Sequence, residues 1–305
     1  MIGSPNDRVD DQVVPRRAYE QTTLNYIRVY KHRAHYDFET VHSITDSTLV
    51  SHVSFIIHDE DGEDTPITMP LTAVLGRYDD DGDGFSISPD ASDAELEQHQ
   101  KQAMQEGPME VYLHGNAASM LYKAIKESNR GEVKVCISST KVDGLVLFPT
   151  PNGHSLNYRS ATLHGIAALV PDTDVRKKRY AMRLLTNHMF RFRWESTYPV
   201  SPAAVDKVKV IQVKIRSAGA KIRTGTIGPF DPHVVSEEDR ARIDAKGTGV
   251  WSGVVPVFEV LGRPVPSGVS GVGGDERGVK SIEAWREQRN QREKGYAKRV
   301  AGAEN

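Results

Sequence analysis

His154-Ser155-Leu156-Asn157-Tyr158-Arg159-Ser160 is the most informative stretch of the chain, because it is polar and lies between two apolar runs, 133–148 and 161–170. Both runs have the composition of core strands. Six of the seven residues of this stretch can form hydrogen bonds through their side chains. Burying so much polarity costs free energy unless each group finds a partner. Either a bound polar ligand or a set of loop and cap hydrogen bonds would supply those partners.

The composition argues against several classes of protein. The chain has 305 residues, a formal net charge of −2 and one cysteine, Cys136. A nearly neutral chain has no general attraction to nucleic acid or anionic lipid, so neither partner is expected. A lone cysteine forms no internal disulfide or Cys-based zinc site, and its strand context predicts an inert buried thiol. Without a signal-like start or a long apolar run, we expect a soluble, cytoplasmic protein.

The pattern of apolar residues predicts a mostly β fold with a few helices. We expect strands at 49–57, 66–75, 109–113, 133–148, 160–170 and 205–215, and helices at 38–47, 117–126, 174–189 and 281–299. Evenly spaced strands with a helix between them favour a barrel or closed sheet.

Composition shifts divide the chain into three parts. Residues 1–24 are expected to be a flexible arm, 25–257 the main domain, and 258–305 a linker followed by a charged helix. An acidic insertion at about 78–107 interrupts the main domain.

Part of that insertion resembles a calcium-binding loop, with Asp79, Asp81, Asp83 and Asp90 at ligand positions and Gly84 at the sharp turn. The final Asp reaches less far than the usual Glu, and Ser86 stands where the loop needs an apolar residue. We therefore expect a solvated acidic loop, and no metal site.

Three further segments have a composition that suits an anionic ligand. The first is Met69-Pro70-Leu71-Thr72, and the second is His114-Gly115-Asn116-Ala117-Ala118-Ser119, where a strand runs into a helix. A helix N-terminus offers unpaired backbone N–H groups to a phosphate, and Gly115 permits close approach. In the third segment Lys221 and Arg223 stand two residues apart. Arg159 could add a bidentate guanidinium.

Taken together, these segments resemble the pyridoxamine 5′-phosphate oxidase-like, FMN-binding split-barrel family, in its flavin-nucleotide-binding, nitroimidazole reductase-like branch. The resemblance covers about residues 25–257 and is carried by 33–37, 52–55, 112–119, 142–147, 154–160, 220–225 and 250–256. It implies a six-stranded split barrel that forms a homodimer, with two FMN sites at the subunit interface.

The resemblance also implies roles for individual residues. Met69, Pro70, Leu71 and Thr72 would lie beside the isoalloxazine ring, and Ser119, Lys123 and Arg159 would hold the phosphate and ribityl chain. Lys221, Arg223 and Trp251 would approach the cofactor from the C-terminal part, either within one chain or across the dimer. The remaining expected cofactor contacts are His114, Gly115, Asn116, Asn157, Tyr158 and Ser160. Met120 departs from the family pattern, which often has a cation there, and Lys123 one turn later is the possible replacement.

The leading functional hypothesis is an FMN-dependent oxidoreductase acting on a small molecule, with His114 as the candidate polar residue near the substrate. A haem-binding or haem-degrading split barrel is the alternative, with His114, His154 or His164 as the axial ligand. A non-catalytic flavin carrier is the third. The residues do not indicate the substrate or the reductant.

Overall fold

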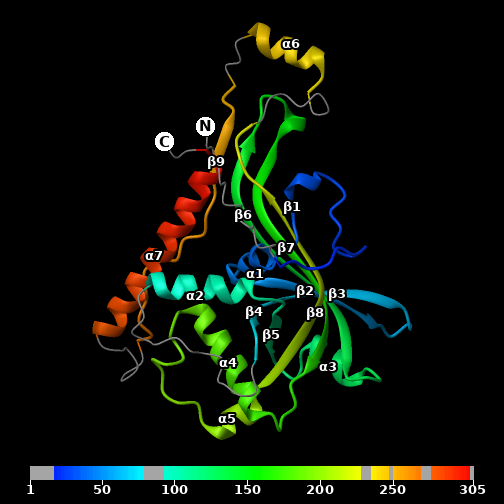
Figure 1. Ribbon diagram of the computed structural model, residues 1–305, viewed down its shortest axis with the longest axis vertical. Coiled ribbons are helices and arrows are strands. Elements are labelled where there is room, and N and C mark those ends of the chain that lie inside the picture. Colours follow the sequence, from blue (N-terminus) through cyan, green and yellow to red (C-terminus); the bar gives the residue numbers. More distant parts are fainter. Residues whose placement is uncertain (1–16, 79–92, 228–234, 247–249, 269–275, 303–305) are drawn as a thin grey trace, which may run out of the picture.

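The fold was analysed in a computed structural model, which describes residues 17–78, 93–227, 235–246, 250–268 and 276–302. Its centre is one antiparallel sheet in the order β3-β2-β6-β7-β8-β5-β4, with β1 added to β8 and β9 to β6 (Figure 1). The strands are β1 (Ala34–His35), β2 (Ser51–His58), β3 (Asp64–Leu71), β4 (Ala73–Gly76), β5 (Glu110–Gly115), β6 (Glu132–Leu147), β7 (Ser155–Leu169), β8 (Lys209–Arg223) and β9 (Gly253–Pro256).

Seven α-helices in the described ranges accompany the sheet, so the fold is mixed α and β rather than mostly β. They are α1 (Phe38–Asp46), α2 (Asp93–Gln105), α3 (Met120–Glu127), α4 (Val175–Met189), α5 (Pro202–Lys207), α6 (Glu237–Lys246) and α7 (Glu276–Val300). Two short 3-10 turns, η1 (Lys31–Arg33) and η2 (Pro151–Gly153), complete the elements.

Two apolar clusters hold the fold together. In the larger one, Val41 and Ile44 of α1 pack against inward residues of the sheet such as Leu163. In the smaller one, Tyr180 and Leu185 of α4 cover the part of the sheet around β4 and β5. Burying such side chains is the main favourable term in folding, so α1 and α4 are fixed by apolar contact.

Most expected elements are confirmed, and the differences have local causes. The return strand at 66–75 breaks at Thr72 into β3 and β4, and the stretch 205–215 begins with the short helix α5, where Ser201 caps the first turn before Pro202. The insertion separates β4 from β5, which pair with each other in antiparallel orientation, and it contains α2. The calcium-like segment lies outside the described residues.

The stretch from His154 to Ser160 differs most from the expectation of a polar segment between two strands. The chain turns through η2, and Ser155–Ser160 already belong to β7, which pairs with β6 on one side and β8 on the other. The pairing path of the sheet runs from β3 to β4, so closure into a six-stranded barrel stays a prediction. Residues 17–24 of the expected arm are packed in part, with Tyr19 buried against Phe38.

Candidate functional site

The side chains of β7 alternate between two environments. Asn157, Arg159 and Ala161 face inward, toward α1 and α7, whereas Tyr158 and Ser160 face outward. The polar stretch is therefore not one ligand-facing wall, because successive residues point to opposite faces of the sheet.

On the inward face Arg159 belongs to a mostly buried group of charges, which we name the α7 ion cluster: Lys141, Asp143, Arg159, Glu259, Arg289 and Glu293. Only the Glu259 side chain, at 55% exposure, lies at the surface. Arg159 donates from Nη2 and Nε to Asp143, at 2.8 Å to Oδ1 and 3.0 Å to Oδ2 respectively. The ring of Tyr296 covers its guanidinium at 3.7 Å. Lys141 Nζ lies 2.5 Å from Glu293 Oε2, and Arg289 Nη2 lies 3.3 Å from Glu259 Oε2.

The carboxylates of this cluster respond differently to their surroundings. Burial raises the pKa of Asp143, and the nearby Arg159 offsets that effect only in part. Burial also acts to raise the pKa of Glu293, but the cations, first of all Lys141, outweigh it and lower the pKa below its ordinary value. Arg159 thus already has an internal carboxylate partner, and phosphate binding by this residue stays a prediction that would require the pair to open.

The outward face of the same strands carries a second set of cations, which we name the cationic face: Arg33, Lys221 and Arg223. Strand register places Lys221 opposite Ser160 and Arg223 opposite Tyr158. The ring of Tyr30 lies 4.2 Å from the Arg33 guanidinium carbon and 5.8 Å from Lys221 Nζ. Within the described ranges, no carboxylate forms an ion pair with any of the three.

Electrostatics show that these cations are crowded. Burial lowers the pKa of Arg223, and the like charge of Arg33 lowers it further. Arg223 Nη1 donates to Asn157 Oδ1 at 2.9 Å and to the carbonyl of Leu156 at 3.3 Å, both of which are neutral acceptors. An anion would therefore relieve repulsion at this face as well as gain hydrogen bonds.

An apolar surface adjoins the cationic face. Register brings Val142 opposite Tyr158, and Leu145 opposite both Leu156 and Val255, on the outward side of β6, β7 and β9. The side chains of Val142, Leu145, Leu156 and Val255 are all partly exposed, and Trp251, just before β9, is 63% exposed. A surface with an apolar part and a cationic end fits a flat aromatic ligand that carries phosphate.

The segment from His114 to Ser119 lies at the other end of β8. Gly115 pairs with Lys209, twelve residues before Lys221, which corresponds to roughly 40 Å along the strand. Ser119 Oγ caps α3 by accepting from Tyr122 N, and Asn116 Oδ1 accepts from Ala118 N. His114 and Lys123 are exposed. One chain therefore does not bring these residues to the cationic face.

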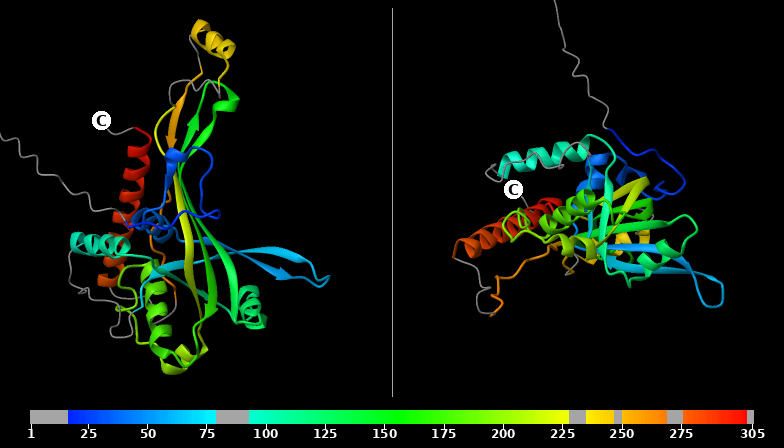
Figure 2. Two further views of the ribbon diagram at one scale, coloured as in Figure 1. Left: turned by 45° about the vertical axis from the view of Figure 1, so that its right-hand side comes forward. Right: turned by 90° about the horizontal axis from the view of Figure 1, so that it is seen from below.

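The segment from Met69 to Thr72 also lies apart from the cationic face. It ends the β2–β3 hairpin, which projects from the body of the molecule (Figure 2). Met69 and Leu71 pack against the larger core, while Pro70 is exposed opposite His52. Strands β2, β6 and β7 lie between this segment on β3 and the cations of β8.

The three histidines proposed as axial ligands have different environments. His114 is exposed, and His154 Nδ1 accepts from the backbone N–H of Phe148 at 2.9 Å. His164 is half-buried on the outward face of β7, where burial lowers the pKa of its imidazole and the backbone of Leu24 hydrogen-bonds to the ring. A neutral imidazole fixed through one nitrogen is the form that binds a metal.

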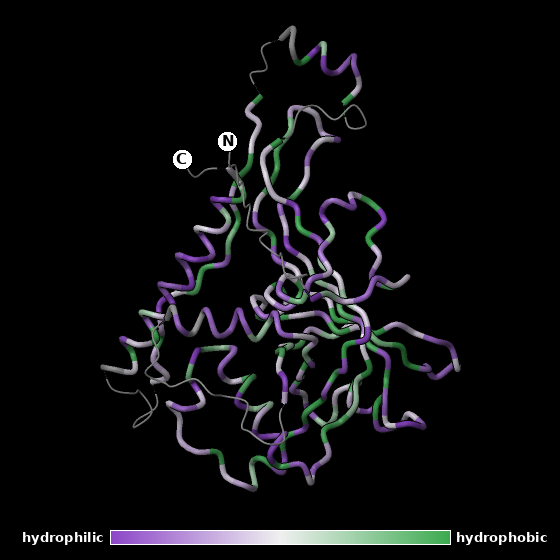
Figure 3. Tube along the Cα trace, in the orientation of Figure 1, coloured by the Kyte–Doolittle hydropathy of each residue, from purple (hydrophilic) through white to green (hydrophobic). Residues whose placement is uncertain are grey.

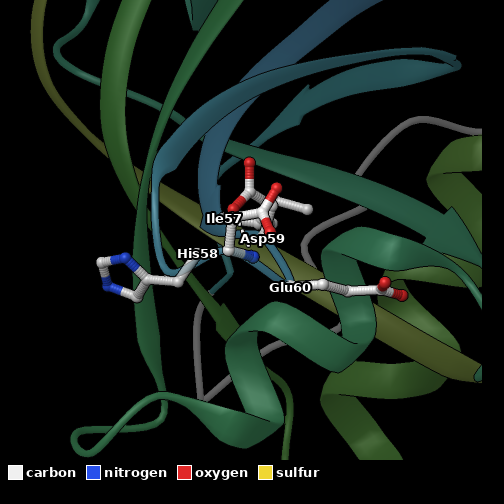
Figure 4. Close-up of a pocket in the computed structure, with 5 residues that line it drawn as sticks. Ile57, His58, Asp59 and Glu60 are labelled. Atoms are coloured by element: carbon white, nitrogen blue, oxygen red, sulfur yellow. Dashed lines mark hydrogen bonds between the residues drawn. The ribbon is translucent and has the colours of Figure 1, made fainter.

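A hollow of about 590 Å³ at the tip of the β2–β3 hairpin is not a convincing site. It is lined by Ile57, His58, Asp59, Glu60 and Asp61, and the side chains of His58 and Glu60 point away from each other (Figure 4). The carboxylate of Asp59 is used locally, since it accepts from Glu63 N and Thr65 Oγ1.

The described part of the chain also gives information on metal sites, membrane spans and the free thiol. There, no group of three or more His, Cys, Asp and Glu residues has a metal-binding arrangement. None of the helices in those ranges is both long enough and apolar enough to cross a membrane. Cys136 is half-buried, and burial raises the pKa of its thiol.

Sequence reasoning did not assign Arg33 or Tyr30 to the site. Tyr30 has a left-handed backbone with φ of 56°, which is uncommon for a residue other than glycine and turns the chain into η1. The motif 33–37 contained Arg33, but only the pairing of β1 with β8, with Ala34 opposite Lys221, places it beside the other cations.

Several solved protein structures are similar to this chain. The flavocytochrome Anf3 from Azotobacter vinelandii has a TM-score of 0.58 and 26% identity, covering 87% of this chain and 97% of that one. The FAD and heme binding protein from Mycobacterium smegmatis has a TM-score of 0.56 and 20% identity, covering 83% and 97%. A putative 5-nitroimidazole antibiotic resistance protein from Bacteroides thetaiotaomicron has a TM-score of 0.40 and 19% identity, covering 62% and 86%.

Comparison with curated proteins gives no match. At the level of families, the one described as pyridoxamine 5'-phosphate oxidase matches residues 37–222, which is more than half of the chain and runs from the start of α1 almost to the end of β8. The chain therefore belongs to the pyridoxamine 5'-phosphate oxidase family.

Proposed function

We propose that this protein binds a flavin nucleotide at the cationic face and uses it in electron transfer. The observation that carries the proposal is the presence of three cations, Arg33, Lys221 and Arg223, beside an exposed apolar strand surface. Phosphate groups suit the cations, and an isoalloxazine ring suits the apolar surface. Bound flavin supplies the hydride or electron chemistry, so this chain's residues need only hold and orient it.

The structural relatives favour a flavin together with haem over FMN alone. One relative at 26% identity is named a flavocytochrome, and the second is named for FAD and heme. We therefore propose haem binding as a second function, and leave both FMN and FAD as candidate flavins. His164 is the candidate axial ligand, because its half-buried imidazole is held neutral and lies on the same face of β7 as Ser160.

The distance between the predicted segments supports a homodimeric site. Ser119 and Lys221 lie at opposite ends of β8, so a second copy would have to bring the α3 end to the cationic face. We propose that the exposed strand surface is shared between two chains, and that the sheet closes as a split barrel in that assembly. A small-molecule substrate would then meet the flavin between the two copies.

Absorbance spectra of the purified protein, taken alone and after addition of FMN, FAD or haem, test both proposals. We expect a flavin band near 450 nm and a Soret band near 400 nm, each saturating at about one cofactor per chain. Reduction of the bound flavin by NADH or NADPH, followed by turnover with an acceptor, would distinguish an oxidoreductase from a flavin carrier.

Variants show whether the cationic face holds the phosphate. Replacing both cations in Lys221→Ala/Arg223→Ala should weaken flavin binding by about 10²- to 10⁴-fold, since charge-assisted hydrogen bonds contribute about 1.5–3 kcal/mol each. Lys134→Ala removes an exposed lysine elsewhere in the sheet and is the matched control. Equal flavin affinity in the double variant and the control would place the flavin elsewhere.

His164→Ala tests the haem ligand in the same way. Loss of the Soret band with unchanged flavin binding would support His164, and His154→Ala serves as the comparison because that ring caps a turn. An unchanged Soret band in His164→Ala would contradict the assignment.

A further inference from the structure

Helix α7 is attached to the sheet in an unusual way. Its inward residues follow a four-residue spacing, and their exposed fractions are 7% for Arg289, 6% for Glu293, 0% for Ala297 and 6% for Ala301. None of the four belongs to either apolar cluster. Figure 3 shows that the residues along the helix are mostly hydrophilic. Charges and small residues, rather than large apolar side chains, therefore form its contact with the sheet.

Ion pairs anchor the middle of α7. Glu293 lies within 2.5 Å of Lys141 Nζ and within 3.6 Å of Arg159 Nη2, and it is almost fully buried. Tyr296, one turn later, covers the guanidinium of Arg159. A buried ion pair contributes little net free energy when intact, but removing one partner leaves the other charge buried and costly. Removing Glu293 should therefore weaken this attachment.

The C-terminal end of α7 reaches the candidate site. The carbonyl of Val300 accepts from Gly225 N at 2.7 Å and from Asn157 Nδ2 at 3.3 Å. Asn157 is fully buried, and its Oδ1 accepts from Arg223 Nη1. One amide side chain therefore connects the end of α7, on the inner side of the sheet, with a cation of the cationic face.

We infer that Asn157 and Glu293 are positioning residues through which the docked C-terminal helix orients Arg223 for its anionic ligand. Glu293 fixes α7 on β6 and β7, which places the Val300 carbonyl against Asn157. Asn157 then holds one nitrogen of Arg223, and the rest of the guanidinium is directed to the outward face. The inference rests on the proposed flavin site only for the identity of the anion. The link between α7 and Arg223 is a property of the chain itself.

Full-length Glu293→Gln and Asn157→Ser variants test the link, with Glu283→Gln as the matched control on the exposed side of α7. Both test substitutions keep a polar side chain, and an unchanged far-ultraviolet circular dichroism spectrum would show that the sheet is intact. Amide hydrogen exchange of α7 and of Gly225 reports docking without any ligand. FMN titration reports the orientation of Arg223.

In Glu293→Gln we expect faster exchange in both α7 and Gly225, and FMN affinity lower by about tenfold, a common size of coupling between two sites. In Asn157→Ser we expect a similar loss of affinity, with faster exchange at Gly225 and only a small change in the middle of α7. The Glu283→Gln control should match the parent in every measurement.

Two results would overturn the inference. Unchanged exchange at Gly225 in Glu293→Gln would show that α7 does not position this end of β8. Faster exchange with unchanged FMN affinity in both variants would show that Arg223 does not depend on α7. If the parent protein binds no FMN at all, the proposed flavin site fails, whereas the exchange data still decide whether α7, Asn157 and Gly225 form one unit.

Discussion

Arg159 and Arg223 lie on neighbouring strands, yet their surroundings are opposite. Arg159 faces inward, its side chain is 13% exposed, and it is paired with Asp143 and covered by Tyr296. Arg223 faces outward, next to other cations and neutral acceptors. The side of a strand thus decides whether an arginine is a structural partner or is available to a ligand. The family resemblance implies Arg159 for the phosphate and ribityl chain, and Arg223 for an approach to the cofactor from the C-terminal part.

The largest expected effect is in Arg159→Ala. Removing this cation leaves Asp143 and Glu293 buried without part of their compensation, so we expect a loss of about 3–5 kcal/mol of stability. Urea unfolding measures it, and Arg193→Ala, at an exposed position, should change stability by less than about 0.5 kcal/mol. A variant with parental stability but no FMN binding would instead make Arg159 a ligand residue and remove the contrast.

The second expected effect is a pH dependence of stability that comes from His42, which lies outside the α7 ion cluster. His42 is buried, and its Nε2 and Nδ1 form hydrogen bonds with the Tyr19 hydroxyl and the Met104 carbonyl. Burial lowers the pKa of its ring to about 4. The unfolded chain binds a proton near pH 6.5 and the folded chain does not, so stability falls as the pH drops from about 6.5 to 4. The loss should reach about 3 kcal/mol, and His42→Gln should remove it.

The carboxylates add their own dependence, Glu293 below about pH 4.5 and Asp143 above about pH 3.8. Because the pKa of folded Glu293 is depressed, its contribution is present above the unfolded value near 4.5 and is lost as the pH falls through the folded value. The raised pKa of Asp143 acts in the opposite sense, since its contribution is lost as the pH rises through the folded value. Comparing unfolding of His42→Gln and Glu293→Gln across pH 3–7 separates the two regions. An identical pH profile for both variants would contradict the assignment of separate pH regions to His42 and Glu293.

The smallest effect concerns the far end of β8. Ser119 caps α3, so Ser119→Ala should lower stability by about 1 kcal/mol. If Ser119 acts only as a cap, FMN affinity will stay at the parental value. A loss of affinity well beyond the stability change would support the dimeric site, in which this helix end approaches the flavin of the partner copy. Thr186→Ala, within α4, is a suitable control for a lost hydroxyl.

Local patterns predicted much of the fold. The helix at 38–47 was recognisable because apolar residues recur at helical spacing, and α1 is capped by Asp37, which accepts from Thr40 N. The two long strands on either side of residue 150 were evident from their apolar composition, and they form β6 and β7. The break at Thr72 and the start of α5 were missed, because element boundaries depend on tertiary packing.

The site was less predictable than the fold. The sequence identified the residue types that an anionic cofactor needs, including Lys221 and Arg223. It did not show that Tyr158 and Ser160 face the opposite side of the sheet from Arg159. In a run of polar residues, the sequence does not indicate which side chains face inward until the strand pairing is known. It also gave no indication that Arg33, nearly 190 residues before Lys221, would join them.

The positions of most strands along the chain, the family and the supply of cations could be recognised without the structure, because these depend on local composition and spacing. Only the tertiary structure decided which cations are neutralised within the chain. The register of β6, β7 and β8 directs Arg159 toward a carboxylate of α7 and directs Arg223 toward the opposite face. The physical reason is that pairing of charges depends on distances between segments far apart in the chain, which local pattern does not contain.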